Sequence, residues 1–395
     1  MVLNFKEFVM FDYVKYAQQM RNELHQCPEI GFDLPKTTAI VRRELDAMGI
    51  SYTEEFGKGS IVATINEGKP FTIGLRGDMD ALPVQENSSN PYPSQHEGCM
   101  HACGHDVHTA QMLAVARQLN DMRDSIRCRV KILFTPAEEY ITPGCKMMVE
   151  NGVTDDIDCL VTAHVDPTIP LGKIGIRAGG VNANSMGVQV EFFGKTAHAN
   201  AQQKGIDAIR MGVEAYTAME MMVARELPSA APCLLNVGAF NAGKTNNIVC
   251  DYAKLFLSAR THDDDLIALM ERRIREICEG IATMCGGSAK VTVTKLLPYV
   301  DNNPIMVEKL LQTADKVVGK ENVITPQRTL GGEDFAFMTR VKPCVLFRLG
   351  STNPENPDTL APLHNGHFDL DEGCFETGIN MFVNFVLDHQ DGITF

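Results

Sequence analysis

Short apolar strands alternate with helices through the first 180 residues, and this alternation limits the fold more than any other feature. The strand patterns lie at 60–65, 71–75, 129–134 and 159–163. The helical patterns lie at 13–48 (interrupted near Pro28 and resuming after Pro35), 106–121 and 144–151. Alternation of this kind is typical of a central, mainly parallel sheet with helices on both faces. We therefore predict an α/β fold for this part of the chain.

Residues 184–296 follow a different order. Their strand and helix patterns lie at 185–193, 205–226, 234–240, 247–260, 264–285 and 290–295. This βαββαβ order is the split, ferredoxin-like unit. The helix and strand alternation then resumes, with a strand at 344–349 and a helix at 372–388. A chain of 395 residues is long enough for two domains. We therefore expect an inserted α+β domain at 184–296, within a first domain formed by 1–183 and 297–395.

Composition excludes several classes of partner. The net charge of −14 argues against a nucleic-acid partner, because such proteins need a basic face. No apolar run is long enough to span a membrane.

Lys6 and Glu7 interrupt the apolar N-terminus, so we expect no signal peptide there. The twelve cysteines include no Cys-x-x-Cys pair, which favours reduced thiols in a cytoplasmic protein.

One ten-residue stretch, Met100-His-Ala-Cys-Gly-His-Asp-Val-His-Thr109, carries three histidines and a cysteine. Cys103 and His105 are separated only by a glycine, so both side chains can converge on one small volume. A thiolate and an imidazole placed together suit a borderline-soft divalent ion such as Zn, Ni, Co or Mn. The stretch is therefore a candidate metal site, and a buried cysteine among surface histidines is the alternative.

Paired acidic residues follow two of the predicted strands. Glu138 and Glu139 come directly after one strand, where neighbouring side chains point in different directions. One carboxylate can then bind a metal while the other moves a proton for hydrolysis. A solvated acidic turn is the alternative for this pair. Asp78 and Asp80 follow another strand and are candidates for orienting a metal-bound histidine.

Further histidines lie at the ends of predicted elements. His164 ends the strand at 159–163, where a lone histidine is more often a structural hydrogen-bonding group than a ligand. His364 and His367 share a turn-rich stretch, and either is a candidate ligand. His198 lies between a strand and a helix of the inserted domain. It could polarise a substrate carbonyl or cap the helix that follows.

Six motifs occur in order along nearly the whole chain. They are Gly-Asp-Met-Asp-Ala-Leu-Pro, Met-His-Ala-Cys-Gly-His-Asp, Pro-Ala-Glu-Glu, Gly-Lys-Thr-Ala-His-Ala, Gly-Glu-Asp-Phe and Pro-Leu-His. The series resembles the dinuclear-metal amidohydrolases of the aminoacylase/carboxypeptidase family. Within that family it resembles the branch of hippurate hydrolase, the plant auxin-conjugate hydrolases and aminobenzoyl-glutamate hydrolase. The resemblance implies a metal-binding catalytic domain and a smaller lid domain that mediates dimerisation.

The resemblance also implies a role for each matching residue. Two divalent ions per chain (Zn, Mn, Ni or Co) would be held by Cys103, which can bridge both, and by His105, Glu139, His164 and His364. Glu138 matches the general base, and Asp80 matches the aspartate that supports the ligands. His198 matches the lid histidine that stabilises the oxyanion, in relatives often from the partner subunit. Asn247 and Arg260 match lid positions associated with the carboxylate end of the substrate.

The function implied is hydrolysis of the amide bond of N-acyl-amino acids or amino-acid conjugates by a metal-activated water. The alternatives are a dipeptidase or carboxypeptidase of the same family, a non-catalytic protein that binds a small ligand, and a thiol hydrolase with Cys103 as nucleophile and His105 as base. Two positions depart from the family pattern, because no proline follows His198 closely and Cys250 stands where a proline is expected. Both departures lie in the predicted lid domain and concern substrate preference.

Overall fold

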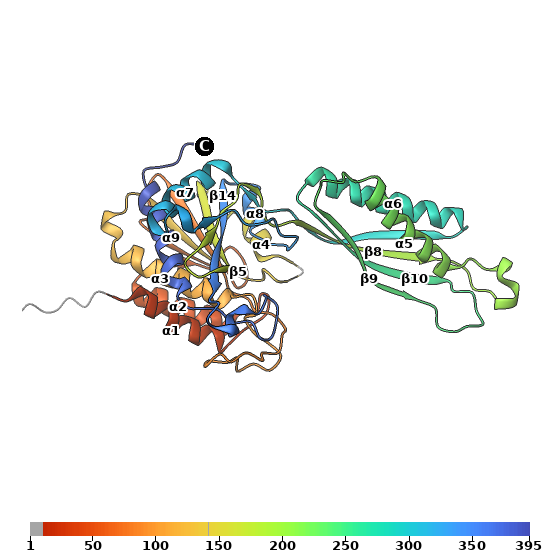
Figure 1. Ribbon diagram of the computed structural model, residues 1–395, viewed down its shortest axis with the longest axis horizontal. Helices are drawn as coiled ribbons and strands as arrows, with labels where there is room; N and C mark the ends of the chain where they lie inside the picture. The colour runs from red at the N-terminus through yellow and green to blue at the C-terminus, as the bar shows by residue number, and fades with distance from the viewer. Residues whose placement is uncertain (1–10, 141) are drawn as a thin grey trace, which may run out of the picture. The chain divides into compact units, whose positions relative to one another are not determined.

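The computed structural model describes residues 11–140 and 142–395, and its ribbon is drawn in Figure 1. The first ten residues, on which the expectation about a signal peptide rests, lie outside the described residues. The chain forms two compact units. The first comprises 11–179, 302–326 and 338–395, and the second comprises 180–301 and 327–337. Within the described residues, no helix combines the length and apolar character needed to cross a bilayer.

The first unit is built around an eight-stranded sheet with the order β1-β2-β4-β3-β5-β14-β6-β13. Its strands are β1 Ser51–Thr53, β2 Ile61–Ile65, β3 Thr72–Asp78, β4 Arg129–Thr135, β5 Cys159–Pro170, β6 Ile174–Gly175, β13 Val323–Ile324 and β14 Cys344–Thr352. Neighbouring pairs among the central strands β4, β3, β5 and β14 are all parallel. Every residue of β3 and of β14 is buried, which requires both faces of the sheet to be covered. The predicted α/β class is confirmed.

Helices flank this sheet. They are α1 Tyr13–His25, α2 Pro35–Met48, α3 His105–Asp121, α4 Gly144–Glu150, α7 Pro304–Val317 and α9 Cys374–His389, with short 3-10 turns at Arg123–Ser125, Lys320–Asn322 and Pro357–Leu360. The helix α3 packs on β3, and α1 lies beside α3 (Figure 1). Local sequence sets the ends of α2, because Pro35 occupies its first turn and Gly49 closes it with a φ of 67°.

The strand β5 is longer than the sequence pattern indicates. The predicted strand ends at Ala163, whereas β5 continues to Pro170 because it pairs with β14 over that length. His164 therefore lies inside a strand, paired with Arg348, and does not follow the strand. This pairing partner is almost two hundred residues away in sequence, so a local pattern cannot reveal it.

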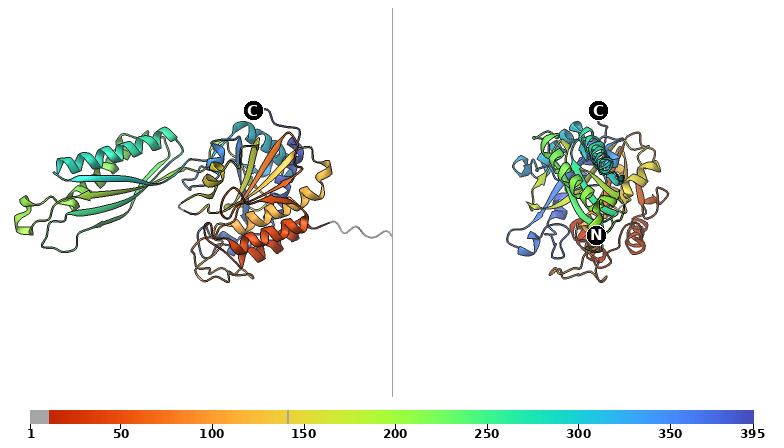
Figure 2. Two further views of the ribbon diagram at one scale, coloured as in Figure 1. Left: turned by 180° about the vertical axis from the view of Figure 1, so that it is seen from behind. Right: turned by 90° about the vertical axis from the view of Figure 1, so that its right-hand side faces the viewer.

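The second unit contains the predicted βαββαβ order. Its elements are β8 Asn184–Phe193, α5 Ala208–Arg225, β9 Cys233–Ala242, β10 Tyr252–Thr261, α6 Asp264–Met284 and β11 Ser288–Leu297, with a 3-10 turn at Ala199–Lys204. The sheet order is β11-β8-β10-β9, and all three pairings are antiparallel. The helices α5 and α6 cover one face of this sheet (Figure 2). Three short elements, β7 Gly179–Gly180, β12 Asp301–Asn302 and α8 Ala336–Thr339, lie where the chain passes between the units.

Two elements of the second unit begin later than predicted. The helix predicted from residue 205 begins at Ala208, because the Asp207 side chain caps it by accepting the backbone N–H of Ile209. The strand predicted from residue 247 begins at Tyr252. Residues 247–251 instead pair with the segment around His198, through an isolated bridge between His198 and Ile248. The apolar run Ile248–Val249 is the reason that the sequence pattern places the start of the strand too early.

Candidate metal centre

The turn between Cys103 and His105 depends on the glycine that separates them. Gly104 has a φ of 80° and stands directly before the first residue of α3. A Cβ at this position would lie 2.5 Å from Cγ2 of Val165. Glycine is therefore required both for the left-handed backbone and for the close approach of β5. As a result, the Cys103 thiol and the His105 imidazole are brought against the same strand.

Cys103, His105 and His164 form a buried cluster whose donor atoms lie within 4.8 Å of one another. The Cys103 Sγ atom is 3.4 Å from Nε2 of His164. Nδ1 of His105 is 2.8 Å from the backbone carbonyl of Asp80, and Nδ1 of His164 is 2.7 Å from that of Val165. A carbonyl only accepts, so in the neutral form of each ring Nδ1 carries the proton and Nε2 keeps a lone pair. These are the tautomers that bind a metal through Nε2.

The fit to a metal can be tested on the His105 ring. Its Nε2 atom is buried and has no hydrogen-bond partner among the described residues. A buried nitrogen lone pair without a partner is costly, and a bound cation would remove that cost. The nearby thiol and carboxylate complete a mixed sulfur, nitrogen and oxygen set that suits a borderline divalent ion. The residues present therefore fit a metal.

The acidic loop after β4 places Glu138 and Glu139 beside this cluster. Glu139 joins Cys103 and His364 in one group of donors, and Glu138 joins Glu139 and His105 in another. The loop is held by Asp80, whose two carboxylate oxygens accept the backbone N–H groups of Glu138 (2.9 Å) and Glu139 (3.1 Å). The two acidic side chains are thus fixed at the edge of the sheet.

Asp80 supports the centre in two ways. Its backbone carbonyl accepts the proton of His105, while its carboxylate holds the acidic loop. Sequence reasoning expected the carboxylate itself to orient a ligand histidine, and its Oδ1 atom is 3.5 Å from Nδ1 of His105. Asp80 therefore connects the histidine with the two glutamates.

Of the two histidines in the turn-rich stretch, the structure brings His364 to the cluster. Its Nε2 atom is 3.0 Å from Oε1 of Glu139. Its backbone N–H donates to the carbonyl of Ala102, beside Cys103, and its φ is 61°. A positive φ in a non-glycine residue is uncommon and is concentrated at functional sites. His367 belongs to no donor group among the described residues.

Burial and neighbouring charges set the protonation of the cluster. Burial raises the pKa of the Cys103 thiol well above its usual range, although the charge of His105 opposes this. Such a thiol is a poor nucleophile unless a cation stabilises the thiolate. Burial also opposes ionisation of Glu139, but the hydrogen bond with His364 and the charge of His105 lower its pKa overall. The centre thus holds an ionised carboxylate beside a thiol that needs a cation.

A second buried pair lies beside the cluster, and it joins the candidate Asp78 to His108, to which the sequence analysis assigned no role. Asp78 and His108 contact each other, with 2.6 Å between Oδ1 and Nδ1, and Asp78 also pairs with Arg76. Burial opposes the charge on Asp78, but Arg76, His105 and His108 hold its pKa well below the usual range. The spacing of three residues between His105 and His108 is a signal for one helix face. The contact with Asp78 leaves no local signal.

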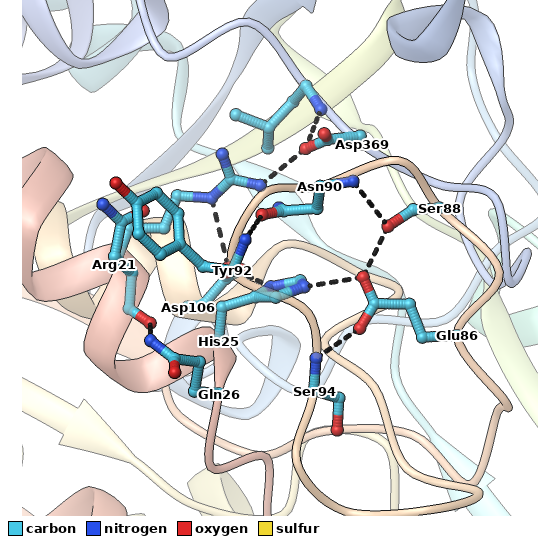
Figure 3. A network of polar contacts seen from close by, with 12 residues as sticks. Arg21, His25, Gln26, Glu86, Ser88, Asn90, Tyr92, Ser94, Asp106 and Asp369 are labelled. Carbon is cyan, nitrogen blue, oxygen red and sulfur yellow. Dashed lines mark hydrogen bonds and ion pairs between the residues drawn. The ribbon is translucent and has the colours of Figure 1, made fainter.

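A network of charged side chains anchors the first turn of α3 (Figure 3). Asp106, which follows His105, accepts hydrogen bonds from Arg21 (3.2 Å) and His25 (2.8 Å) of α1. The second nitrogen of His25 is 3.2 Å from Glu86, and Arg21 also pairs with Asp369. The network therefore ties α1 and two loop segments to the helix that presents His105.

The remaining predicted residues lie in the second unit. The backbone N–H of Ala199, next to His198, donates to the Asn247 carbonyl at 3.0 Å, so these two predicted residues are neighbours. Arg260 is near the far end of β10 and donates to the Leu330 carbonyl at 2.7 Å. Arg260 is eight positions along the strand from Tyr252, or roughly 26 Å at the usual rise. Within one unit, Arg260 therefore lies far from His198 and Asn247.

The fold and this donor set define a two-domain α/β hydrolase. The sequence pattern described as "Peptidase family M20/M25/M40" matches residues 74–388, and the chain belongs to that family. The chain is 33% identical to the hippurate hydrolase of Campylobacter jejuni, over 94% of this chain and 96% of that protein. It is also 33% identical to the N-acetyl-L-cysteine deacetylase of Bacillus subtilis, over 80% and 76% of the two chains.

A solved structure gives the same result. The YXEP protein of Bacillus subtilis, described as a dinuclear metal binding peptidase from the M20 family, matches with a TM-score of 0.81. It is 26% identical, and the match covers 95% of this chain and 98% of that one. The resemblance inferred from the six motifs is confirmed at the level of the family.

Proposed function

We propose that this protein hydrolyses the amide bond of N-acyl-amino acids, using two divalent ions held by five of its side chains. The observation that carries the proposal is the convergence of Cys103, His105, Glu139, His164 and His364, with the lone pairs of His105 and His164 left for a cation. When bound, the ions would supply Lewis acidity toward the amide carbonyl and lower the pKa of water. Which of Zn, Mn, Ni and Co is the native metal depends on metal availability as well as on the donor set.

Glu138 is the general base in this proposal. Its neighbour Glu139 pairs with His364, whereas Glu138 shares a donor group with His105 at the edge of the centre. Asp80 fixes the backbone of both residues and so holds Glu138 at the edge of the centre. Glu138 would take a proton from the attacking water and deliver it to the leaving amine.

His198 has the tautomer that an oxyanion donor requires. Its Nδ1 atom accepts the backbone N–H of Asn200 at 3.2 Å, which caps the following 3-10 turn. The proton of the neutral ring therefore lies on Nε2, and His198 is exposed. Capping and catalysis, which the sequence analysis treated as alternatives, are compatible in this geometry. We assign His198 to stabilising the negative charge that develops on the amide oxygen.

Asn247 and Arg260 are assigned to the carboxylate end of the substrate. Oδ1 of Asn247 accepts the hydroxyl of Thr245 at 2.7 Å, which orients the side-chain amide. Because Asn247 lies before the start of β10 and Arg260 lies near its end, both can serve one substrate if the two residues come from different chains. This separation supports a homodimer formed through residues 184–296, which would act as a lid and dimerisation domain.

The relatives indicate the class of substrate. They include a hippurate hydrolase and an N-acetyl-L-cysteine deacetylase, both of which are named for N-acyl-amino acids. A thermostable carboxypeptidase of Saccharolobus solfataricus, 29% identical, supports a peptidase as the second candidate. The raised pKa of the buried Cys103 argues against a thiol hydrolase. The unpaired cysteines, all twelve of them, support a reducing compartment such as the cytoplasm.

A substrate panel separates these candidates. Metal-loaded protein would be given hippurate, N-acetyl-cysteine, dipeptides, and amidated forms that lack the free carboxylate. We expect release of a free amino acid from the acylated compounds and little turnover of the amidated forms. Faster turnover of dipeptides would favour the carboxypeptidase assignment. Tight binding of N-acyl-amino acids without turnover of any compound would favour a non-catalytic binding protein.

A further inference from the structure

His108 packs against two of the proposed metal ligands, His105 and His164. It lies on α3, three residues after His105, and its ring centroid is 5.5 Å from that of His105. The ring meets His164 edge to face, with 4.7 Å between the centroids. His108 is only 3% exposed, so these contacts are part of the packed interior. None of the roles assigned above uses this residue.

Both nitrogens of the His108 ring are engaged. The backbone N–H of Val165 donates to Nε2 at 3.0 Å, and Nδ1 is 2.6 Å from Oδ1 of Asp78. A backbone N–H can only donate, so Nε2 presents its lone pair and Nδ1 carries the proton. Asp78 accepts that proton and is itself held by Nη1 of Arg76 at 2.7 Å. The tautomer and the orientation of His108 are therefore both determined.

The bond to Val165 acts directly on His164. The N–H that His108 accepts belongs to the peptide group joining His164 to Val165, so His108 fixes the backbone on which the ligand side chain is mounted. The His164 ring is further restrained by its own hydrogen bond to the Val165 carbonyl. Groups that orient a metal-bound imidazole commonly affect metal affinity as strongly as some ligands do.

We propose that His108 is a positioning residue for the metal centre. Through its contacts with the Val165 N–H and with the His164 ring, His108 holds the His164 imidazole with Nε2 directed at the ion. The inference rests on the proposed function, because it takes His164 as a ligand. Arg76 and Asp78 contribute to the same positioning, since they set the His108 tautomer.

Direct ligation by His108 is the competing role. Donor atoms of Asp78, His105 and His108 lie within 4.8 Å of one another, as a metal site would require. Both His108 nitrogens are already engaged, however, at 2.6 and 3.0 Å. A metal on His108 would have to displace Asp78 or the Val165 N–H. The two roles predict different numbers of bound ions in a His108 variant. Loss of a ligand would empty a metal site, whereas loss of a positioning residue would only lower its affinity.

The test compares His108→Leu and His108→Gln with a matched control. Glutamine keeps an acceptor that reaches the Val165 N–H, and leucine removes it. His389→Leu removes another buried histidine of the same unit, whose Nε2 bonds the Lys309 carbonyl on α7. Metal-stripped proteins would be titrated with Co²⁺ against a competing chelator. We expect H108L to bind two ions but to weaken one about 10–100-fold, H108Q to recover part of the loss, and H389L to match the wild type.

Three results would overturn the inference. They are wild-type affinities in H108L, saturation of both His108 variants at one ion, and an equal loss in H389L. Nitrogen NMR of ring-labelled metal-free protein gives an independent reading, in which His164 should show one Nδ1–H tautomer in the wild type and a mixture in H108L. An unchanged His164 signal in H108L would also refute the positioning role. A wild-type protein that binds no ion would instead contradict the proposed function, and the NMR result would still decide this inference.

Discussion

In the proposed mechanism the adjacent glutamates Glu138 and Glu139 have different tasks, because the backbone presents them differently. Ala137, just before them, has a φ of 56°, which is uncommon for a residue with a side chain. The strain is balanced by the two hydrogen bonds that Asp80 accepts from the loop. Glu139 is thereby turned toward His364, and Glu138 is the carboxylate assigned to proton transfer. Strained backbone of this kind is often retained where it orders reactive groups.

Glu138→Gln tests this division of labour. The amide keeps the shape of the side chain but cannot take a proton, so we expect kcat to fall by about 10²–10⁴-fold. Metal content should stay at the wild-type level, because Glu139 and the other ligands are untouched. Turnover and bound metal would be measured on the same samples. A variant that loses an ion along with its activity would show that Glu138 is a ligand and not the base.

Residue types made these side chains candidates for a metal site, and the resemblance to the family implied which of them are ligands. Cysteine, histidine and glutamate at close spacing have few common uses other than a metal, so the candidates were recognisable in the sequence. The supporting roles were not. The use of the Asp80 backbone carbonyl, and the contact of His108 with the Val165 N–H, depend on groups that every residue carries. Such contacts arise only when distant segments meet.

At the scale of elements, the start of α3 is constrained in two ways. Gly104 must adopt a left-handed conformation and must also leave room for Val165 on β5. Gly49 at the end of α2 shares the first requirement only, with a φ of 67° and no atom within 4 Å of the position of a Cβ. Comparing Gly104 with Gly49 therefore separates the cost of a positive φ from the cost of a steric clash with a neighbouring side chain.

Gly104→Ala and Gly49→Ala should therefore differ. Both lose about 1–2 kcal/mol of unfolding free energy, because alanine resists a positive φ. Gly104→Ala should lose more and should also weaken metal binding, since its methyl group would displace Val165 next to His164. Urea unfolding and metal titration of both variants would measure this. Equal stability losses with unchanged metal affinity would mean that the turn does not order the ligands.

The network in Figure 3 gives the contact between α1 and α3 a dependence on pH. Burial disfavours protonation of His25, but hydrogen bonds to Asp106 and Glu86 outweigh it and raise the pKa to about 9, with Arg21 opposing. The folded protein therefore binds this proton more tightly than the unfolded chain does. The stabilisation is complete below the unfolded pKa near 6.5 and is lost as the pH rises through about 9.

We expect the unfolding free energy to fall by up to roughly 3 kcal/mol between pH 6.5 and 9.5 because of this proton. His25→Gln, which cannot be protonated, should be less stable than the wild type at pH 6.5 and should show a flatter profile. Denaturant unfolding at several pH values, on metal-free protein, would measure both curves. Parallel curves for the two proteins would show that His25 is not protonated in the folded state.

Element boundaries were predictable where a local device sets them. Pro35 and Gly49 delimit α2, and both are visible in the sequence. The extension of β5 through His164 was not visible, because it depends on pairing with β14. The late start of β10 was also missed, since residues 247–251 pair with the segment around His198 and not with the sheet.

At the scale of the whole molecule, the proposed dimer makes a prediction about shared sites. If the catalytic glutamate and the lid histidine of one site come from different chains, two inactive variants should complement each other. An equal mixture of Glu138→Gln and His198→Ala chains, dissociated and reassociated, should recover about a quarter of wild-type activity, because half of the dimers carry one intact site of two. Activity that stays at the level of the separate variants would place both residues of a site on one chain.

The most direct test of the central claim follows activity as metal is restored. Metal-stripped protein would be reloaded stepwise with Mn²⁺, Zn²⁺, Co²⁺ or Ni²⁺, while bound ions per chain and hydrolysis of N-acyl-amino acids are measured on each sample. We predict no turnover without metal, saturation at two ions per chain, and release of a free amino acid. Full turnover by the metal-free protein would contradict the assignment of Cys103, His105, Glu139, His164 and His364 as the metal centre on which hydrolysis depends.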